Sequence, residues 1–190
     1  MDRQCTIDEQ PAQPTLCVKT RTPAARIGEV LGQAFNDLIS AVTAQGATVS
    51  GLPYVAYRNM NLSDLDLEIG VPVSKPLAAR GRIEPGELPG GVWASTLHIG
   101  PYDGVGPAWN ELHGYLRAQG KVAAPVGYEF YFDAPETLPE RTRTRVAFPL
   151  LPPAVATGPS FASAEGPRGG SSTRHIRTRP LRYSFRPRVP

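Results

Sequence analysis

Residues 125–131, Pro-Val-Gly-Tyr-Glu-Phe-Tyr, follow an amphipathic segment that ends at Gln119-Gly120. They repeat the plan of an earlier stretch, in which residues 53–58, Pro-Tyr-Val-Ala-Tyr-Arg, follow an amphipathic segment that ends at Gln45-Gly46. A short aromatic and β-branched run is typical of a strand, and glycine tolerates the positive φ that ends a helix. The chain therefore predicts that one structural unit occurs twice.

Each half follows the order strand, helix, strand, strand. The predicted elements of the first half are strands at 14–19, 53–58 and 64–69 and a helix opened by Thr22-Pro23; those of the second are strands at 92–99, 125–132 and 143–150 and a helix that runs to Gly120. Apolar residues recur at the three-and-four spacing of one helix face between Ile27 and Val42, so the first helix should lie on a sheet. Between the halves, the Gly- and Pro-rich residues 85–91 predict a loop.

These elements predict an α+β fold. We expect pseudo-twofold tandem β-α-β-β modules, at approximately 14–74 and 91–151, forming one antiparallel sheet with two helices on one face and a ligand cleft between the modules. Residues 1–13 are interpreted as an N-terminal extension of the domain that spans 14–151. Residues 152–190 are interpreted as a disordered tail rich in proline and arginine.

The net charge of +3 is unevenly distributed. Residues 151–190 contain seven arginines against one acid, Glu165, which gives this stretch +6 and leaves −3 on the body of the chain. An arginine-rich tail could bind nucleic acid or anionic surfaces, but a passive extension is the favoured interpretation.

Other features exclude several classes of protein. The polar start and the lack of a run of about 20 apolar residues predict a cytoplasmic protein without a membrane segment. Cys5 and Cys17 lie close together, which favours reduced thiols over a disulfide framework. His98 and His113 fall on different elements without clustered Cys or Asp partners, so we expect no metal site. We expect no cofactor, because no phosphate loop, dinucleotide fingerprint or nucleophile elbow is present.

Comparison of the two halves singles out Glu129. Laying Pro53 on Pro125 matches Tyr57 with Glu129, so the halves differ at a central strand position. Strand alternation puts Glu129 and Tyr131 on one face and Tyr128, Phe130 and Phe132 on the other. We expect the aromatic face to pack under the helices, which leaves Glu129 on the opposite face.

Two interpretations of Glu129 remain open. It is either solvated or paired with an arginine such as Arg58, or it is the charge of an aromatic pocket for a cationic ligand or for proton transfer. In the pocket interpretation the ligand-binding residues, listed together, are Glu129, Tyr57, Tyr131, Trp93 and Tyr102. Trp109 is interpreted as a core residue of the second helix.

Four stretches of the second half resemble the GyrI-like small-molecule-binding family. They are Leu-His-Ile-Gly-Pro-Tyr-Asp at 97–103, the helix with Trp109 and Gln119-Gly120, the strand at 125–131, and Val-Ala-Phe-Pro-Leu at 146–150. That family includes the effector domains of AraC-type and multidrug-responsive regulators. The resemblance implies a pseudo-twofold fold with a ligand cleft between the modules.

The resemblance further implies that Glu129 matches the pocket glutamate of the family and that Tyr57 stands where members often place a pocket tyrosine. It leaves three functions open. The first is a stand-alone domain that captures hydrophobic, cationic small molecules, as an effector sensor or a sequestering protein. The second is a hydrolase that opens cyclopropane rings of DNA-alkylating natural products, with Glu129 activating water and Tyr57 as the other catalytic residue, bonding the departing oxygen.

The third function is inhibition of DNA gyrase through an interaction with it, for which the acidic body surface would be the relevant feature. About a dozen residues precede the first predicted strand, which is too few for a helix-turn-helix or winged-helix reader. We therefore expect no direct sequence-specific DNA binding, and any DNA-binding partner would be encoded separately.

Overall fold

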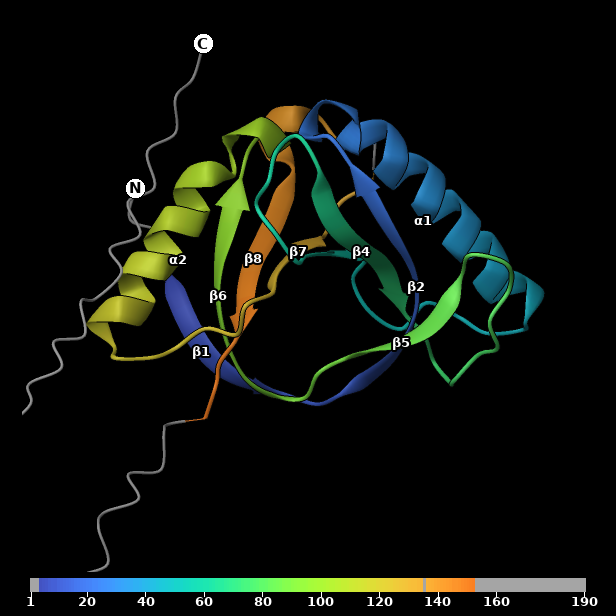
Figure 1. Cartoon of the computed structure of the whole chain (residues 1–190), viewed down its shortest axis with the longest axis horizontal. Helices are drawn as coiled ribbons and strands as arrows, with labels where there is room; N and C mark the ends of the chain where they lie inside the picture. The colour runs from blue at the N-terminus through green and yellow to red at the C-terminus, as the bar shows by residue number, and fades with distance from the viewer. Residues whose placement is uncertain (1–3, 135, 153–190) are drawn as a thin grey trace, which may run out of the picture. The chain divides into compact units, whose positions relative to one another are not determined.

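The computed structural model describes residues 4–134 and 136–152, and in them eight antiparallel strands form one curled sheet (Figure 1). The strands are β1 (Cys5–Gln10), β2 (Gln13–Thr22), β3 (Tyr54–Tyr57), β4 (Leu65–Pro72), β5 (Glu84–Leu88), β6 (Gly91–Ile99), β7 (Gly127–Tyr131) and β8 (Arg143–Pro149). The two long helices are α1 (Ile27–Ala44) and α2 (Gly106–Ala118), and single 3₁₀ turns lie at Ala24–Arg26, Tyr102–Gly104 and Pro139–Arg141. The predicted α+β class is confirmed.

The strand order is β1-β6-β8-β7-β3-β4-β2-β5. The elements β2, α1, β3 and β4 supply one side of the β7–β3 boundary, and β6, α2, β7 and β8 supply the other. At the boundary itself Val55 lies opposite Glu129, and Tyr54 lies opposite Phe130. Two strands that are distant in sequence therefore meet in the middle of the sheet.

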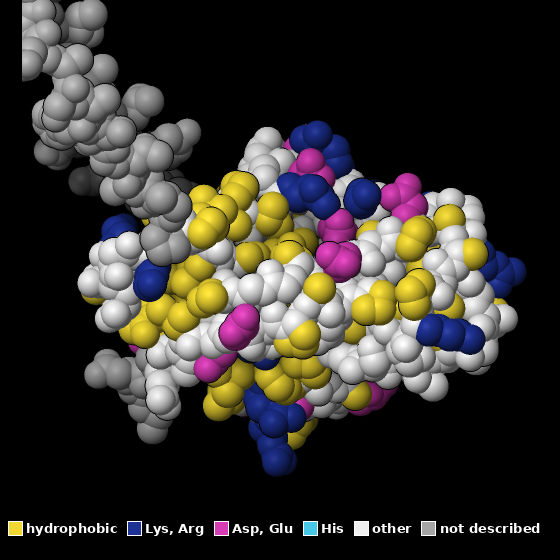
Figure 2. Space-filling view, turned by 90° about the horizontal axis from the view of Figure 1, so that it is seen from below, with side chains coloured by type: hydrophobic (Ala, Val, Ile, Leu, Met, Phe, Trp, Pro, Cys, Tyr) yellow, Lys and Arg dark blue, Asp and Glu magenta, His cyan; other side chains and the backbone are white. Residues whose placement is uncertain are grey.

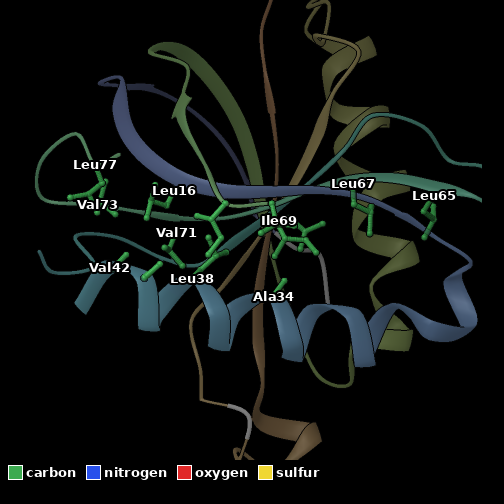
Figure 3. Packing of buried hydrophobic residues seen from close by; sticks show 14 residues of the cluster. Leu16, Ala34, Leu38, Val42, Leu65, Leu67, Ile69, Val71, Val73 and Leu77 are labelled. Carbon is green, nitrogen blue, oxygen red and sulfur yellow. The ribbon is translucent and has the colours of Figure 1, made fainter. Parts of the chain in front are cut away.

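Both helices end where the sequence predicts. Gly46 has a φ of 62° and Gly120 a φ of 61°, the left-handed conformation that stops a helix. The buried stripe of α1 packs on the sheet, and Figure 3 shows this contact: Ala34, Leu38 and Val42 of α1 lie against Leu16, Ile69 and Val71 of β2 and β4. Full burial of a leucine such as Leu38 stabilises the fold by about 1.5–3 kcal/mol.

Both helices cover the same face of the sheet. Val55 and Glu129 are directly opposed on neighbouring strands, so their side chains share a face. Val55 belongs to the core under α1, and Val146, the partner of Glu129 on β8, belongs to the core under α2. No helix of the described residues covers the opposite face, and that face holds a separate aromatic cluster that includes Tyr128 and Phe130.

The expectation that Tyr128 and Phe130 pack under the helices is therefore wrong. The helices rest largely on aliphatic side chains, such as Ile69 under α1 and Val146 under α2. The aromatic rings instead pack on one another, with the ring centroids of Trp93 and Tyr128 4.9 Å apart. Glu129 consequently lies on the helix-covered face.

The two edge strands also differ from expectation. Residues 5–10, interpreted as part of an extension, form β1 and pair with β6. Residues 84–88, expected within or beside a loop, form β5 and pair with β2 despite Pro85 and Gly86. An edge strand tolerates proline because the N–H that proline lacks is not needed on the open side.

No helix among the described residues is both long and apolar enough to cross a membrane. The predicted disordered tail, beyond Pro152, lies outside the residues that the structure describes.

Candidate functional site

Glu129 lies at the centre of β7, and its side chain is held by three neutral donors. The hydroxyls of Tyr57 and Tyr131 donate to Oε2 over 3.0 and 2.9 Å, and the indole Nε1 of Trp109 donates to Oε1 over 3.0 Å. Glu129 is only 6 % exposed. Donors from β3, β7 and α2 thus converge on one buried carboxylate.

No described basic residue forms an ion pair with Glu129. The other buried acid, Glu68, shows the usual solution: its Oε2 lies 2.6 Å from the guanidinium of Arg58, and the hydroxyl of Tyr54 donates to its Oε1 over 3.0 Å. Arg58 is therefore paired with Glu68. The alternative that the sequence left open, in which Arg58 pairs with Glu129, is wrong. Glu129 is a buried acid supported by hydrogen bonds alone.

Aromatic rings enclose the carboxylate. Tyr57 meets Trp109 of α2 edge-to-face with centroids 6.2 Å apart, and Tyr131 meets Phe35 of α1 at 6.1 Å. Tyr102, in the turn before α2, meets Tyr131 at 5.6 Å. Rings from both helices therefore pack against the two tyrosines that bind Glu129, whose side chain has little contact with solvent.

The environment keeps the two tyrosines protonated. Burial, and then the charge of Glu129, raise the pKa of Tyr57 well above its ordinary value. The same two causes in the same order raise the pKa of Tyr131. Both hydroxyls therefore remain donors throughout the neutral range.

The structure brings together most of the residues proposed from the sequence. Tyr57, Tyr131 and Glu129 are in direct contact, and Tyr102 lies at the rim with 48 % of its surface exposed. Trp93 lies on the other face, where its indole N–H donates to the carbonyl of Pro89. The sheet therefore separates Trp93 from the Glu129 site.

Trp109 is the site residue that sequence reasoning missed, because it was assigned to the core alone. A buried indole N–H needs an acceptor, and a buried carboxylate needs donors. Had these two requirements been considered together, they would have linked Trp109 to Glu129.

The family model of the GyrI-like small molecule binding domain matches residues 3–151. The chain belongs to the GyrI-like family. A comparison with curated proteins finds no match.

Three solved proteins resemble this GyrI-like domain in fold. EcmrR in a complex with DNA matches with a TM-score of 0.71 and 18 % sequence identity, and the match covers 78 % of this chain and 57 % of EcmrR. The EcmrR C-terminal domain alone matches with a TM-score of 0.68 and 19 % identity, and the match covers 80 % of this chain and 99 % of that domain. A hydrolase from Listeria innocua matches with a TM-score of 0.58 and 12 % identity, and the match covers 78 % of this chain and 92 % of the hydrolase. SAV2435 bound to tetraphenylphosphonium matches with a TM-score of 0.57 and 14 % identity, and the match covers 80 % of this chain and 94 % of SAV2435. The chain spans little more than half of the length of EcmrR.

Alkaline unfolding should report the two tyrosines that donate to Glu129. Because their pKa values are raised on folding, the stability they contribute is fully present below about pH 10, the ordinary tyrosine pKa, and is lost as the pH rises further. Each such group adds a slope of about 1.4 kcal/mol per pH unit to the fall in unfolding free energy. Urea titrations above pH 10 should show a shallower fall in Tyr57→Phe. An unchanged slope in that variant would contradict the assignment.

Gly127 makes room for Trp109 in this GyrI-like domain. A Cβ at this position would lie 2.7 and 2.8 Å from two ring carbons of Trp109 and 3.0 Å from Phe148. We expect Gly127→Ala to lower the free energy of unfolding by about 1–3 kcal/mol and to move the indole away from Glu129. Urea unfolding measures the first effect, and indole fluorescence measures the second.

Gly114→Ala is the matched control, because Gly114 lies in the same helix as Trp109 and a Cβ there meets nothing within 4 Å. That change should stabilise the helix by roughly 0.5–1 kcal/mol. Equal stabilities of the two variants would show that the space beside Trp109 is not needed.

Proposed function

We propose that this GyrI-like domain captures hydrophobic cations of varied shape at Glu129, as an effector sensor or a sequestering protein. The observation that carries the proposal is the buried carboxylate of Glu129, which has three neutral donors and no ion pair with a described residue. A buried charge without a partner is costly, so a cation that reaches it gains the missing interaction. Each aromatic face that meets the cation adds roughly 0.5–2 kcal/mol.

The position of Glu129 at the β7–β3 boundary supports a ligand site between two halves. We propose that tandem β-α-β-β modules at about 14–74 and 91–151 build this junction by pseudo-twofold symmetry. The matched positions then differ in chemistry, since one module supplies Tyr57 and the other Glu129. Their direct hydrogen bond means that a ligand would enter beside the pair by displacing rings such as those of Phe35 and Trp109.

The relatives support a role of this class. SAV2435 is bound to tetraphenylphosphonium, a hydrophobic cation, and EcmrR is found in a complex with DNA. We propose that this chain senses or sequesters such a cation, and that any contact with DNA would be made by a part or partner beyond the domain.

The fluorescence of Trp109 provides the test of where the ligand binds. In a Trp93→Phe variant the remaining tryptophan is Trp109, whose indole touches Glu129. Titration with tetraphenylphosphonium should change its emission in a saturable manner, because the cation displaces or contacts the indole. Saturable binding by equilibrium dialysis without any change in emission would place the ligand away from Glu129, and absence of binding would refute the proposal.

The hydrogen-bonded pair of Tyr57 and Glu129 also favours hydrolysis as a second candidate function. Glu129 would take a proton from a water whose oxygen bonds to a cyclopropane carbon. The broken carbon–carbon bond would then deliver its electron pair to a conjugated oxygen, which accepts a hydrogen bond from Tyr57 and takes a proton from solvent, while Glu129 returns its proton to solvent. A hydrolase from Listeria innocua shares the fold.

Analysis of products after incubation with a cyclopropane-bearing DNA alkylator tests the hydrolase. Ring-opened product should form, and Glu129→Gln should abolish it; turnover that persists in this variant would exclude the proposed base. The gyrase role stays a prediction from resemblance, and normal supercoiling by gyrase with excess protein would exclude it.

A further inference from the structure

The helix-free face of the sheet contains a hollow of about 280 Å³. Its walls come from the central strands and from the β1–β2 and β5–β6 turns, which cross the lower part of Figure 1 and touch at Gly90 and Ala12. Seen from below, the surface shows hydrophobic side chains interspersed with a few acidic and basic ones (Figure 2). This hollow lies on the opposite side of the sheet from Glu129.

The lining of the hollow includes two aromatic rings and one cationic side chain. Trp93 and Phe130 line it, with their ring centroids 6.0 Å apart. The guanidinium of Arg145 lies 4.4 Å from the centroid of the Phe130 ring. A hydrophobic wall and a positive charge therefore face the same space.

The guanidinium of Arg145 lacks part of its hydrogen bonding. Its Nε is buried and has no hydrogen-bond partner, and no ion pair joins its guanidinium to an acid within the described ranges. Arg143, two residues away on the same strand, differs because Asp133 binds it at 2.7 Å. Burial lowers the pKa of the Arg145 guanidinium, and the charge of Asp8 opposes this effect.

We propose that this hollow is a second ligand site, which binds a small aromatic carboxylate. The ring of the ligand lies against Trp93 and Phe130, and its carboxylate accepts hydrogen bonds from the terminal nitrogens of the Arg145 guanidinium. Guanidinium and carboxylate match in a planar, two-point geometry, and such charge-assisted bonds are the stronger ones. The volume is slightly below the roughly 300–1,000 Å³ of pockets for drug-sized ligands, which suits a molecule of one or two rings.

This site is independent of the proposed function at Glu129, because the two differ in face and in ligand charge. Asp8 lines the hollow as well, and its negative charge competes with that of the ligand. Asp8→Asn should therefore raise the affinity for a carboxylate.

Calorimetric titration of the full chain with 2-naphthoate and with neutral 2-naphthalenemethanol tests the proposal. The naphthoate should bind about tenfold tighter or more, because the alcohol cannot pair with a guanidinium. Equal affinities for the two molecules would overturn the proposal, and this comparison needs no variant.

Variants locate the ligand. Arg145→Met should weaken naphthoate binding about tenfold to a hundredfold, and Arg145→Lys, which keeps the charge but loses the two-point geometry, should give an intermediate loss. Arg143→Met is the matched control and should bind naphthoate as the unchanged protein does. Naphthoate affinity that survives Arg145→Met, or that is lost in Glu129→Gln, would overturn the assignment. A full affinity for tetraphenylphosphonium in Arg145→Met would show that the variant is folded, independently of the second site.

Discussion

Replacing Glu129 with glutamine is expected to weaken the binding of tetraphenylphosphonium by about thirtyfold or more, which corresponds to about 2 kcal/mol. The substitution keeps the shape of the side chain and removes its charge. The donors Tyr57 and Tyr131 can reorient toward the amide, so the fold should persist. Isothermal titration calorimetry of the two proteins measures the difference.

Glu68→Gln is the matched control for this experiment. Glu68 is also buried, but it lies on the helix-free face and is paired with Arg58. The control should bind tetraphenylphosphonium with unchanged affinity. If Glu129→Gln binds the cation as tightly as Glu68→Gln, charge pairing at Glu129 does not drive binding.

Replacing Gly70 with alanine is expected to lower the free energy of unfolding by about 3 kcal/mol. A Cβ on Gly70 would lie within 2.6 Å of three atoms at the hydroxyl end of Tyr54, including its oxygen. Tyr54 is fully buried, and its hydroxyl bonds Thr15 over 3.2 Å and Glu68 over 3.0 Å. The ring therefore cannot move aside without breaking buried hydrogen bonds. Urea unfolding followed by circular dichroism gives the value.

Gly32→Ala separates the effect of crowding from the general effect of adding a methyl group. Gly32 lies in α1, and a Cβ there meets nothing within 4 Å. This variant should be as stable as the unchanged protein or slightly more stable. A Gly70→Ala protein that loses less than about 0.5 kcal/mol, the range of ordinary surface changes, would show that the sheet yields easily at this point.

The sequence predicts well what depends on local chemistry. Gly46 and Gly120 end the helices because their backbone conformation suits glycine. The offset of 72 residues that matched Tyr57 with Glu129 also gives their spatial relation, since the two side chains are hydrogen-bonded. What the match cannot give is a ligand, so the role of the pair in binding stays a prediction.

The sequence predicts poorly what depends on tertiary packing. Alternation in β7 shows that Glu129 and Phe130 face opposite ways, but it does not show which face the helices cover. That choice depends on neighbouring strands, whose aliphatic residues such as Ile69 and Val146 form the core under the helices. The β5 strand was missed for a similar reason, since pairing with β2 outweighs the local tendency of Pro85 and Gly86 to form a loop.

In the proposed function, Glu129 is a buried negative charge that selects hydrophobic cations. The most direct measurement compares the affinity of the unchanged protein for tetraphenylphosphonium with its affinity for neutral triphenylphosphine oxide, at 0.15 M ionic strength (about physiological) to screen surface charges. The cation should bind about thirtyfold tighter or more than the neutral molecule, because only the cation compensates the carboxylate. Equal affinities for the cation and the neutral molecule would contradict it.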